Sequence, residues 1–264
     1  MVSGNIENRF ESLSPQKKDL FLKKLSGLES KQKRVPHANN ESQYQLSAMQ
    51  ESFLILGNIT EEVAVNHITL SLNIHTEFKE EIFLQSLQIV TERHSMLRSS
   101  VVEEGGRARN VIQPQVDMIY SYHNLRAFDK SAKEAESKKL LDTENNKLFV
   151  LDRAPLWRVS VLNLESRKFL VHVVMHHMIG DGWSFQVFLN DFLTCYNALD
   201  TGVQADLDEL LQDYGDYVQW EIERRGEKGE ELETYWEQRL RGSTSFLGLE
   251  TDFPRNPKRQ YHSD

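Results

Sequence analysis

The feature of the sequence that most constrains the fold is a strand pattern followed directly by a helix pattern. The apolar run Phe169–Met175 is typical of a buried strand, and apolar residues recur at helical spacing from Phe185 onward. Two adjacent histidines, His176 and His177, lie at the junction together with an aspartate and a glycine. A helix N-terminus leaves backbone N–H groups free for a ligand. Because the pKa of histidine lies nearest to neutral pH, the junction first suggests proton transfer.

Strand and helix patterns alternate along the rest of the chain, which predicts a layered α/β domain. Strands are expected at Val63–His75, Leu97–Val102, Ala108–Ile112, Trp157–Leu162 and Lys168–Met175. Helices are expected after Ser14, from Ser47 to Leu56, after a cap at Thr76, at 129–147, after the histidines, at Leu207–Arg224 and at Glu230–Arg241. The helix at 129–147 is rich in Lys, Glu and Ala, and we expect it to be solvated.

The first part of the chain differs from the rest in composition. A polar, basic stretch from Ser30 to Gln43 contains Pro36 and is typical of a linker. Residues 1–43 are therefore expected to form an appendage, a helix followed by a linker, which serves either as a docking segment or only as a connection. Residues 44–264 are expected to form the main domain.

Composition and charge exclude several classes of protein. The formal net charge of −9 argues against nonspecific binding to nucleic acid or to an anionic membrane. The longest apolar runs are too short to span a bilayer, and the N-terminus has no apolar signal core. A single cysteine, Cys195, excludes an internal disulfide and agrees with a cytoplasmic location.

Six segments of the sequence resemble, in order, motifs of one known family. They are Leu46–Gln50 (LSxxQ), Arg93–Ser99 (RHExLRT), Phe149–Leu156 (FDLxxxPL), His176–Ser184 (HHxxxDG followed by Trp-Ser), Tyr214–Trp220 (YxDFAxW) and Leu249–Arg255 (LPTDxPRP). The chain resembles the condensation domains of nonribosomal peptide synthetases. The HHxxxDG segment is the most specific of these matches. The LSxxQ segment is the weakest, because Ser52 and Leu54 stand where the family has Arg and Trp.

The resemblance implies a chloramphenicol-acetyltransferase-like fold, in which a mixed sheet is flanked by helices. Condensation domains have two such lobes, so residues 44–264 would be the N-terminal lobe without the second one, and the isolated chain is expected to be inactive. The family joins an acyl or peptidyl thioester to an aminoacyl acceptor, both held on phosphopantetheine arms. The implied partners are donor and acceptor carrier proteins and adjacent synthetase domains or the C-terminal lobe. No directly bound cofactor, metal, nucleic acid or membrane is expected, and the chain is expected to be a monomer.

The resemblance also suggests roles for the residues of the motif. His177 would accept a proton from the attacking amine or orient it, and Gly182 would allow close approach and offer its N–H to an oxyanion. His176 would make a structural hydrogen bond inside the domain. Asp181 would hold the loop by pairing with an arginine.

Four further residues are candidates for supporting the site. Arg93 and Arg98 are the expected partners of the aspartate. Trp183 and Ser184 would begin the following helix, the first by packing and the second as a possible cap, and both are candidates for lining the substrate tunnel. The aromatic residues of the YxDFAxW segment, Tyr214, Tyr217 and Trp220, fall at helical spacing and are expected to be core.

Other functions remain open from the sequence. A coenzyme-A-dependent acyltransferase shares the shorter HxxxDG pattern, and a non-catalytic module that only docks carrier proteins is a third possibility. A metal site built from His172, His176, His177 and Asp181 has no supporting cysteine cluster or HExxH helix. The intact histidines favour condensation over heterocyclisation, but they leave the donor and the acceptor unidentified.

Overall fold

The computed structural model describes residues 42–59, 64–244, 248 and 252. The chain divides into two compact units, 1–36 and 37–264, and all described residues belong to the second. The helix expected after Ser14, nearly all of the linker at Ser30–Gln43 and all but one residue of Leu249–Arg255 lie outside the described residues.

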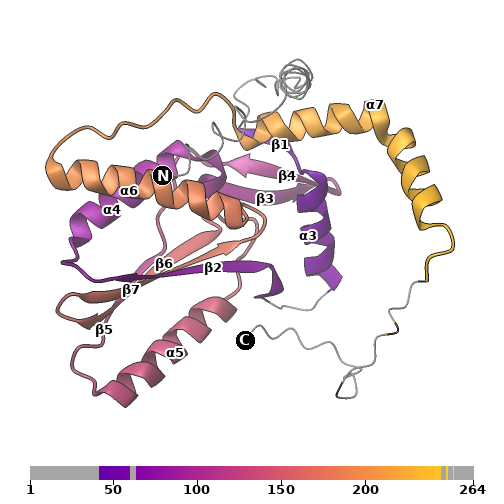
Figure 1. The fold of residues 1–264 in the computed structure, drawn as a ribbon. Helices are drawn as coiled ribbons and strands as arrows, with labels where there is room; N and C mark the ends of the chain where they lie inside the picture. Colours follow the sequence, from indigo (N-terminus) through magenta and orange to yellow (C-terminus); the bar gives the residue numbers. More distant parts are fainter. Residues whose placement is uncertain (1–41, 60–63, 245–247, 249–251, 253–264) are drawn as a thin grey trace, which may run out of the picture. The chain divides into compact units, whose positions relative to one another are not determined.

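The described elements alternate between strands and helices, as the sequence predicts (Figure 1). The strands are β1 (Gln43–Gln45), β2 (His67–Ile74), β3 (Ser99–Glu104), β4 (Arg107–Ile112), β5 (Tyr120–Asn124), β6 (Trp157–Glu165) and β7 (Lys168–His176). The helices are α3 (Ala48–Ile59), α4 (Glu80–Arg93), α5 (Lys130–Asn146), α6 (Gly182–Thr201) and α7 (Tyr214–Leu240), with short 3-10 helices at Ala64–Asn66 and Ser95–Arg98.

The main sheet has four strands in the order β2-β7-β6-β5. Strands β2, β7 and β6 pair antiparallel, whereas β5 pairs parallel with β6, so the sheet is mixed as expected. A smaller antiparallel sheet has the order β1-β4-β3. Its β3–β4 hairpin turns at Gly105 and Gly106, where φ is 60° and 77°. Two successive positive φ angles suit a tight hairpin turn and favour glycine at both positions.

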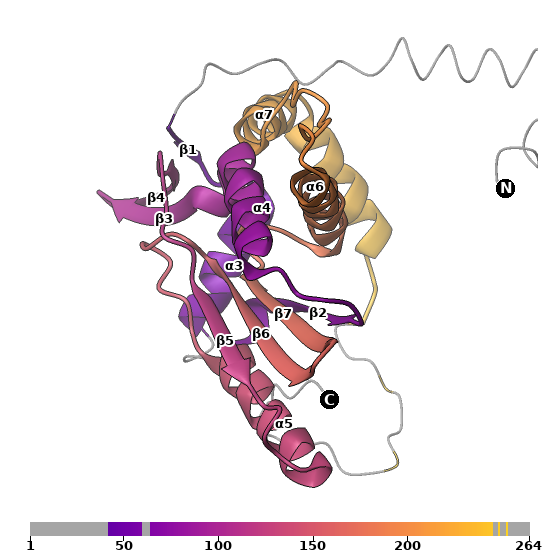
Figure 2. The same ribbon diagram turned by 90° about the vertical axis from the view of Figure 1, so that its left-hand side faces the viewer.

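Helices cover both faces of the main sheet (Figure 2), with α4 and α6 on one side and α5 on the other. Side chains alternate along β7, so Val171, Val173 and Met175 enter the main core, together with Phe83 of α4 and Phe188 of α6. The even-numbered residues of β7 point to the opposite face, toward α5. This alternation decides where each of the two neighbouring histidines lies.

Helix α5 has no buried residue, which confirms the prediction of a solvated helix.

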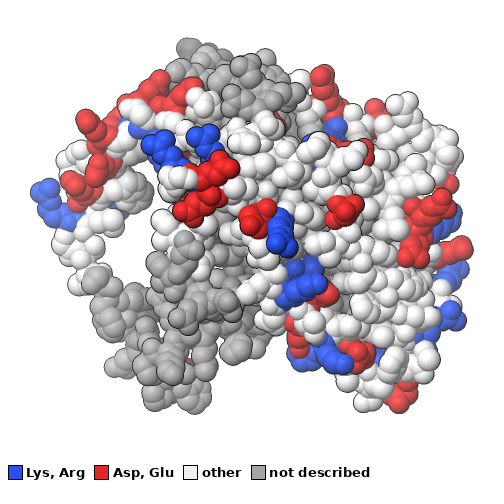
Figure 3. Space-filling model, turned by 180° about the vertical axis from the view of Figure 1, so that it is seen from behind, with Lys and Arg blue, Asp and Glu red and all other residues white. Residues whose placement is uncertain are grey.

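Charged side chains of both signs are interspersed on the surface shown in Figure 3. On α7, Arg225 forms a local ion pair with Glu221 at 3.0 Å. None of the helices in the described part of the chain is long and apolar enough to cross a membrane.

Several predicted boundaries are wrong. The strand predicted at Val63–His75 is β2, which begins only at His67, after a 3-10 helix. Thr76 does not cap α4, whose N-cap is Lys79 without a side-chain hydrogen bond. The two helices predicted at Leu207–Arg224 and Glu230–Arg241 are replaced by α7, a single helix that begins at Tyr214. The sequence analysis also missed β1 and β5, which are short and carry mostly polar residues.

Candidate functional site

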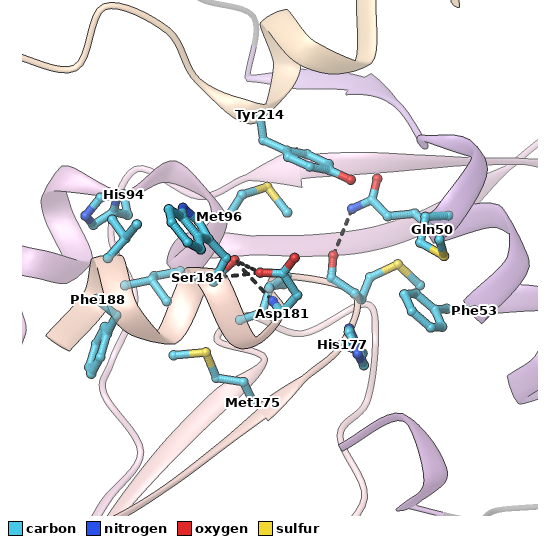
Figure 4. A pocket seen from close by; sticks show the side chains of 17 residues that line it. Gln50, Phe53, His94, Met96, Met175, His177, Asp181, Ser184, Phe188 and Tyr214 are labelled. Carbon is cyan, nitrogen blue, oxygen red and sulfur yellow. Dashed lines mark hydrogen bonds between the residues drawn. The ribbon is translucent and has the colours of Figure 1, made fainter. Parts of the chain in front are cut away.

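A pocket of about 520 Å³ opens where β7 ends and α6 begins (Figure 4). Helix α3, the 3-10 helix after α4 and the first residue of α7 complete its wall. Its lining is mainly apolar and includes Phe53, Phe188 and four of the chain's six methionines, Met49, Met96, Met175 and Met178. Methionine side chains are flexible and polarizable, so such a wall adapts to the shape of an apolar group.

His177 lines this pocket and is half-buried. Its ring stacks on the ring of Phe53 from α3, with 4.8 Å between the centroids (Figure 4). Its backbone N–H donates to the carbonyl of Asn66 at 2.7 Å, which anchors the loop to the segment before β2. These contacts hold the His177 ring at the pocket wall, where it can meet a ligand.

His176 lies on the opposite face of the sheet and is buried. Its Nδ1 accepts a hydrogen bond from the backbone N–H of Met178 at 3.0 Å. Burial, with a smaller contribution from the neighbouring His67 and His177, lowers the pKa of His176 to about 4. The imidazole is therefore neutral at pH 7 and acts on the loop as a hydrogen-bond acceptor.

A polar cluster surrounds His176 beneath the main sheet, that is, on the face that α5 covers. His67, its cross-strand partner, contacts the carbonyl of Asn145 through Nδ1 at 2.8 Å. His172 contacts the side-chain oxygen of Asn145 at 2.8 Å. Arg158 pairs with Glu144 at 2.7 Å. Burial lowers the pKa of His67 and of His172. The end of α5 is thus bonded to the sheet through polar groups, although no residue of that helix is buried.

Asp181 is the N-cap of α6. Its side chain accepts from the backbone N–H and the hydroxyl of Ser184, both at 2.8 Å, and the Ser184 hydroxyl accepts from the Asp181 N–H at 3.1 Å. This reciprocal capping box starts the helix, so Ser184 supports the cap but is not itself the N-cap. The hydrogen bonds from Ser184 lower the pKa of Asp181.

The expected pairing of Asp181 with an arginine is wrong in this structure. Arg93 instead donates to Asp191 of α6 at 2.9 Å and to the carbonyl of Asp208. Arg98 donates to the backbone carbonyl oxygens of Thr91, Glu92, Gln113 and Pro114. Both arginines therefore bind other parts of the described chain. The capping box with Ser184, and not an arginine, holds Asp181 in place.

The two glycines beside Asp181 have different surroundings. Among the residues that the structure describes, none has an atom within 4 Å of a Cβ added to Gly182, so their packing does not require glycine there. A Cβ on Gly180 would lie 3.1 Å from the Cβ of Ser184, which is a tight contact. The packing role expected for Trp183 is wrong, since its side chain is 78% exposed, but it does line the pocket together with Ser184.

Two contributors to the pocket were missed or misjudged. Gln50 is fully buried and donates from Nε2 to the carbonyl of Met178 at 2.9 Å. Tyr214 bonds through its hydroxyl to Ser47 at 2.9 Å and lines the pocket, whereas it was expected in the core. On α7 the buried residues are Asp216 and Val218, not the aromatic ones. The LSxxQ and YxDFAxW segments were the available signals for both residues.

The metal interpretation gains no support from the geometry. Within the described ranges, no group of three or more His, Cys, Asp or Glu side chains is placed to hold a metal ion. His172 is bonded to Ser71 and Asn145 beneath the sheet, away from His177.

Comparison with known proteins assigns the family. The model of the condensation-domain family matches residues 40–264. The chain belongs to this family. Condensation domains form peptide bonds in nonribosomal peptide synthesis, acting on substrates held by phosphopantetheine. The family is catalytic, and its members interact with carrier proteins and adjacent synthetase domains.

Similar curated proteins are much longer than this condensation-domain chain. One of the linear gramicidin synthase proteins of Brevibacillus parabrevis is 34% identical over 220 residues, which is 83% of this chain and 4% of that protein. Phosphinothricin tripeptide synthetase PhsC of Streptomyces viridochromogenes is 28% identical over 255 residues, covering 95% of this chain and 24% of that protein.

Solved structures support the fold. The first condensation domain of the CDA synthetase aligns with a TM-score of 0.70 at 18% identity, covering 79% of this chain and 53% of that one. The starter condensation domain of rhizomide synthetase RzmA, in complex with C8-CoA, aligns with a TM-score of 0.70 at 16% identity and covers 77% and 46%. The chain spans about half of these structures, corresponding to their N-terminal lobe. The expected chloramphenicol-acetyltransferase-like fold is thus confirmed.

Proposed function

We propose that this chain supplies the histidine side of an active site that forms an amide between two carrier-bound substrates. The donor is an acyl or peptidyl thioester, and the acceptor is an aminoacyl group with a free amine. The observation that carries the proposal is the position of His177, whose ring lies on the wall of an apolar pocket that the first residues of α6 also line.

The chemistry requires little activation, because a thioester is already reactive. The amine nitrogen attacks the thioester carbonyl, the C–N bond forms, and the C–S bond breaks to release the phosphopantetheine thiol. An α-amine has a pKa of about 7.7–8.0, so it must lose a proton to react and the departing sulfur must gain one. His177 accepts the proton or orients the amine, an assistance worth about 10²–10⁴-fold.

The developing oxyanion needs hydrogen-bond donors in the same place. Gly182 is the first residue of α6, and the first N–H groups of a helix have no partner within the helix. Within the described part of the chain, a Cβ added to Gly182 would meet no atom within 4 Å, so a substrate can approach the backbone there. His176 and Asp181 act indirectly, His176 by accepting from the Met178 N–H and Asp181 by capping α6.

The proposed site extends beyond this chain. We expect residues 44–264 to act as the N-terminal lobe, with residues 1–43 as a helix and linker, and the C-terminal lobe to provide the other wall. Donor and acceptor carrier proteins would deliver their phosphopantetheine arms to the pocket, whose apolar lining favours an apolar acyl or side chain. The chain alone is then expected to have little activity.

The test measures amide formation between acyl-loaded and aminoacyl-loaded carrier proteins by mass spectrometry of the products. The chain is assayed alone and joined to the C-terminal half of a condensation domain. His177→Ala is expected to reduce the rate of the joined protein by about 10²–10⁴-fold. His75→Ala, at an exposed histidine beyond the end of β2, is the matched control and should keep the rate. Equal rates for His177→Ala and the control would refute the role of His177.

A coenzyme-A-dependent acyl transfer is the second candidate. The observation that favours it is the similar fold of a starter condensation domain that was solved in complex with C8-CoA. The same assay distinguishes the two, because an acyltransferase of this kind uses coenzyme A thioesters and needs no donor carrier protein. If the protein uses coenzyme A thioesters as donors and no carrier-bound donor, it is a coenzyme-A-dependent acyltransferase and the proposed function is wrong.

A further inference from the structure

We infer that Gln50 and Asn110 form a buried amide pair that positions His177, so that both are positioning residues for the reaction. The inference rests on the proposed function of His177. Neither residue needs to touch the substrate, because the pair acts through the backbone of Met178. Gln50 lies on α3, Asn110 on β4 of the small sheet, and Met178 on the loop after β7.

The two side chains exchange a pair of hydrogen bonds. Gln50 donates from Nε2 to Oδ1 of Asn110 at 3.0 Å, and Asn110 donates from Nδ2 to Oε1 of Gln50 at 2.9 Å. Both residues are almost completely buried, with exposed fractions of 1% and 0%. A buried amide lowers the stability of the fold unless each of its donors and acceptors makes a hydrogen bond. The remaining N–H and oxygen groups of this pair therefore need further partners in the protein.

Those partners are all present. Gln50 also donates to the Met178 carbonyl at 2.9 Å and accepts from the N–H of Ser47 at 3.1 Å. Asn110 also donates to the carbonyl of Gln45 at 3.1 Å and accepts from the hydroxyl of Ser99 at 3.4 Å. Since only the amide nitrogens can donate to the two carbonyl oxygens, the orientation of both side chains is determined. The saturated pair ties β1, β3, β4 and α3 to one carbonyl of the loop.

That carbonyl belongs to the residue directly after His177. The same peptide segment is held on its other side, where the His177 N–H donates to Asn66 and the Met178 N–H donates to His176. Gln50 and Phe53 lie one helical turn apart on α3, so a single helix face supports both the loop carbonyl and the His177 ring. Without Gln50, the buried carbonyl would need a new donor, and the loop would move with His177 on it.

The pair makes a prediction that a merely structural contact does not. Gln50→Met keeps the size of the side chain and removes its hydrogen bonds, so the kcat of the joined protein should fall by about 10–100-fold with little change in KM, as for a misplaced catalytic group. Asn110→Leu should have a smaller effect in the same direction. Because Asn110 acts through Gln50, the double variant should lose no more than Gln50→Met alone.

A matched control separates positioning from stability. Asn163 is a buried asparagine on β6 that donates to the Tyr122 hydroxyl at 2.8 Å and does not line the pocket. Asn163→Leu removes a buried amide and its hydrogen bond, and it should leave kcat unchanged in assays below the melting temperature of the variant. If Gln50→Met does not fold, Asn110→Ser, which leaves Gln50 in place, carries the same comparison.

A spectroscopic readout works without turnover. The imidazole signals of His177 in the NMR spectrum of the 264-residue chain, assigned with His177→Ala, should shift or broaden in Gln50→Met and stay in place in Asn163→Leu. Unchanged His177 signals together with an unchanged kcat would overturn the inference, and so would additive effects in the double variant. If instead His177→Ala has no effect on amide formation, the proposed function fails, whereas the NMR result still decides whether the pair positions the ring.

Discussion

The substitution His176→Asn tests whether a buried neutral histidine makes the fold sensitive to acid. Asparagine removes the titrating imidazole but keeps a side-chain oxygen that can accept from the Met178 N–H, as Nδ1 does at 3.0 Å. Burial lowers the pKa of His176 from 6.5 to about 4 in the folded chain, because a charged imidazole there would be poorly solvated.

The size of the effect follows from proton linkage. Because the folded-state pKa lies below the unfolded one, the unfolded chain binds more protons, and stability falls as the pH drops through 6.5 toward 4. Between pH 7 and pH 5 the His176 contribution to the free energy of unfolding falls by about 2 kcal/mol. The lowered pKa values of His67 and His172 act in the same direction and remain in the variant.

Urea unfolding of both proteins at pH 7 and pH 5 measures this difference. The free energy of unfolding of the parent chain should fall by about 2 kcal/mol more than that of His176→Asn over this interval. His75→Asn, at an exposed position, is the matched control and should behave as the parent does. If the parent and His176→Asn lose the same stability between the two pH values, the buried imidazole is not the source of acid sensitivity.

Four substitutions at helix starts separate stability from activity, and thermal melting together with the amide-formation assay measures them. Asp181→Ala and Asp129→Ala each remove the N-cap of a helix, α6 and α5 respectively, and should cost about 1 kcal/mol. Of these two helices only α6 lines the pocket, so only the loss of Asp181 should lower amide formation; equal rates would contradict this. Gly180→Ala should lower the free energy of unfolding by about 1–3 kcal/mol, because the new Cβ would lie 3.1 Å from the Cβ of Ser184. An unchanged melting temperature would show that this contact relaxes. Gly182→Ala meets no atom within 4 Å and should keep the melting temperature while it slows amide formation, and a full rate would argue against close approach of substrate there.

Much of the fold is visible in the sequence because local patterns carry it. The β6–β7 hairpin follows from two apolar runs joined by a short polar turn, and the β3–β4 hairpin from Gly105-Gly106. Helix α7 is one helix where two are predicted, and it runs through Gly226 and Gly229 without a break. A glycine inside a helix costs only about 1 kcal/mol, and the Asp213 capping box and local ion pairs support the longer helix.

The site was harder to predict, because its geometry depends on residues far apart in the sequence. The Asp181–Ser184 capping box is local and could have been recognised from Asp-Gly-Trp-Ser, yet a long-range arginine was expected instead. The contact between Gln50 and Asn110 joins residues 60 positions apart on a helix and a strand. No local periodicity indicates such a pair, so only the folded structure reveals it.

The alternation of side chains along β7 has a consequence for any attempt to transplant the motif. His176 faces the polar cluster near α5, and His177, one residue later, reaches the pocket. Deleting one residue in β7 would turn His176 to the pocket face and His177 to the face beneath the sheet, because a shift by one residue moves every side chain to the opposite face. The ladders to β2 and β6 on both sides oppose such a slip. A grafted HHxxxDG segment therefore needs the register of its strand as much as its own seven residues.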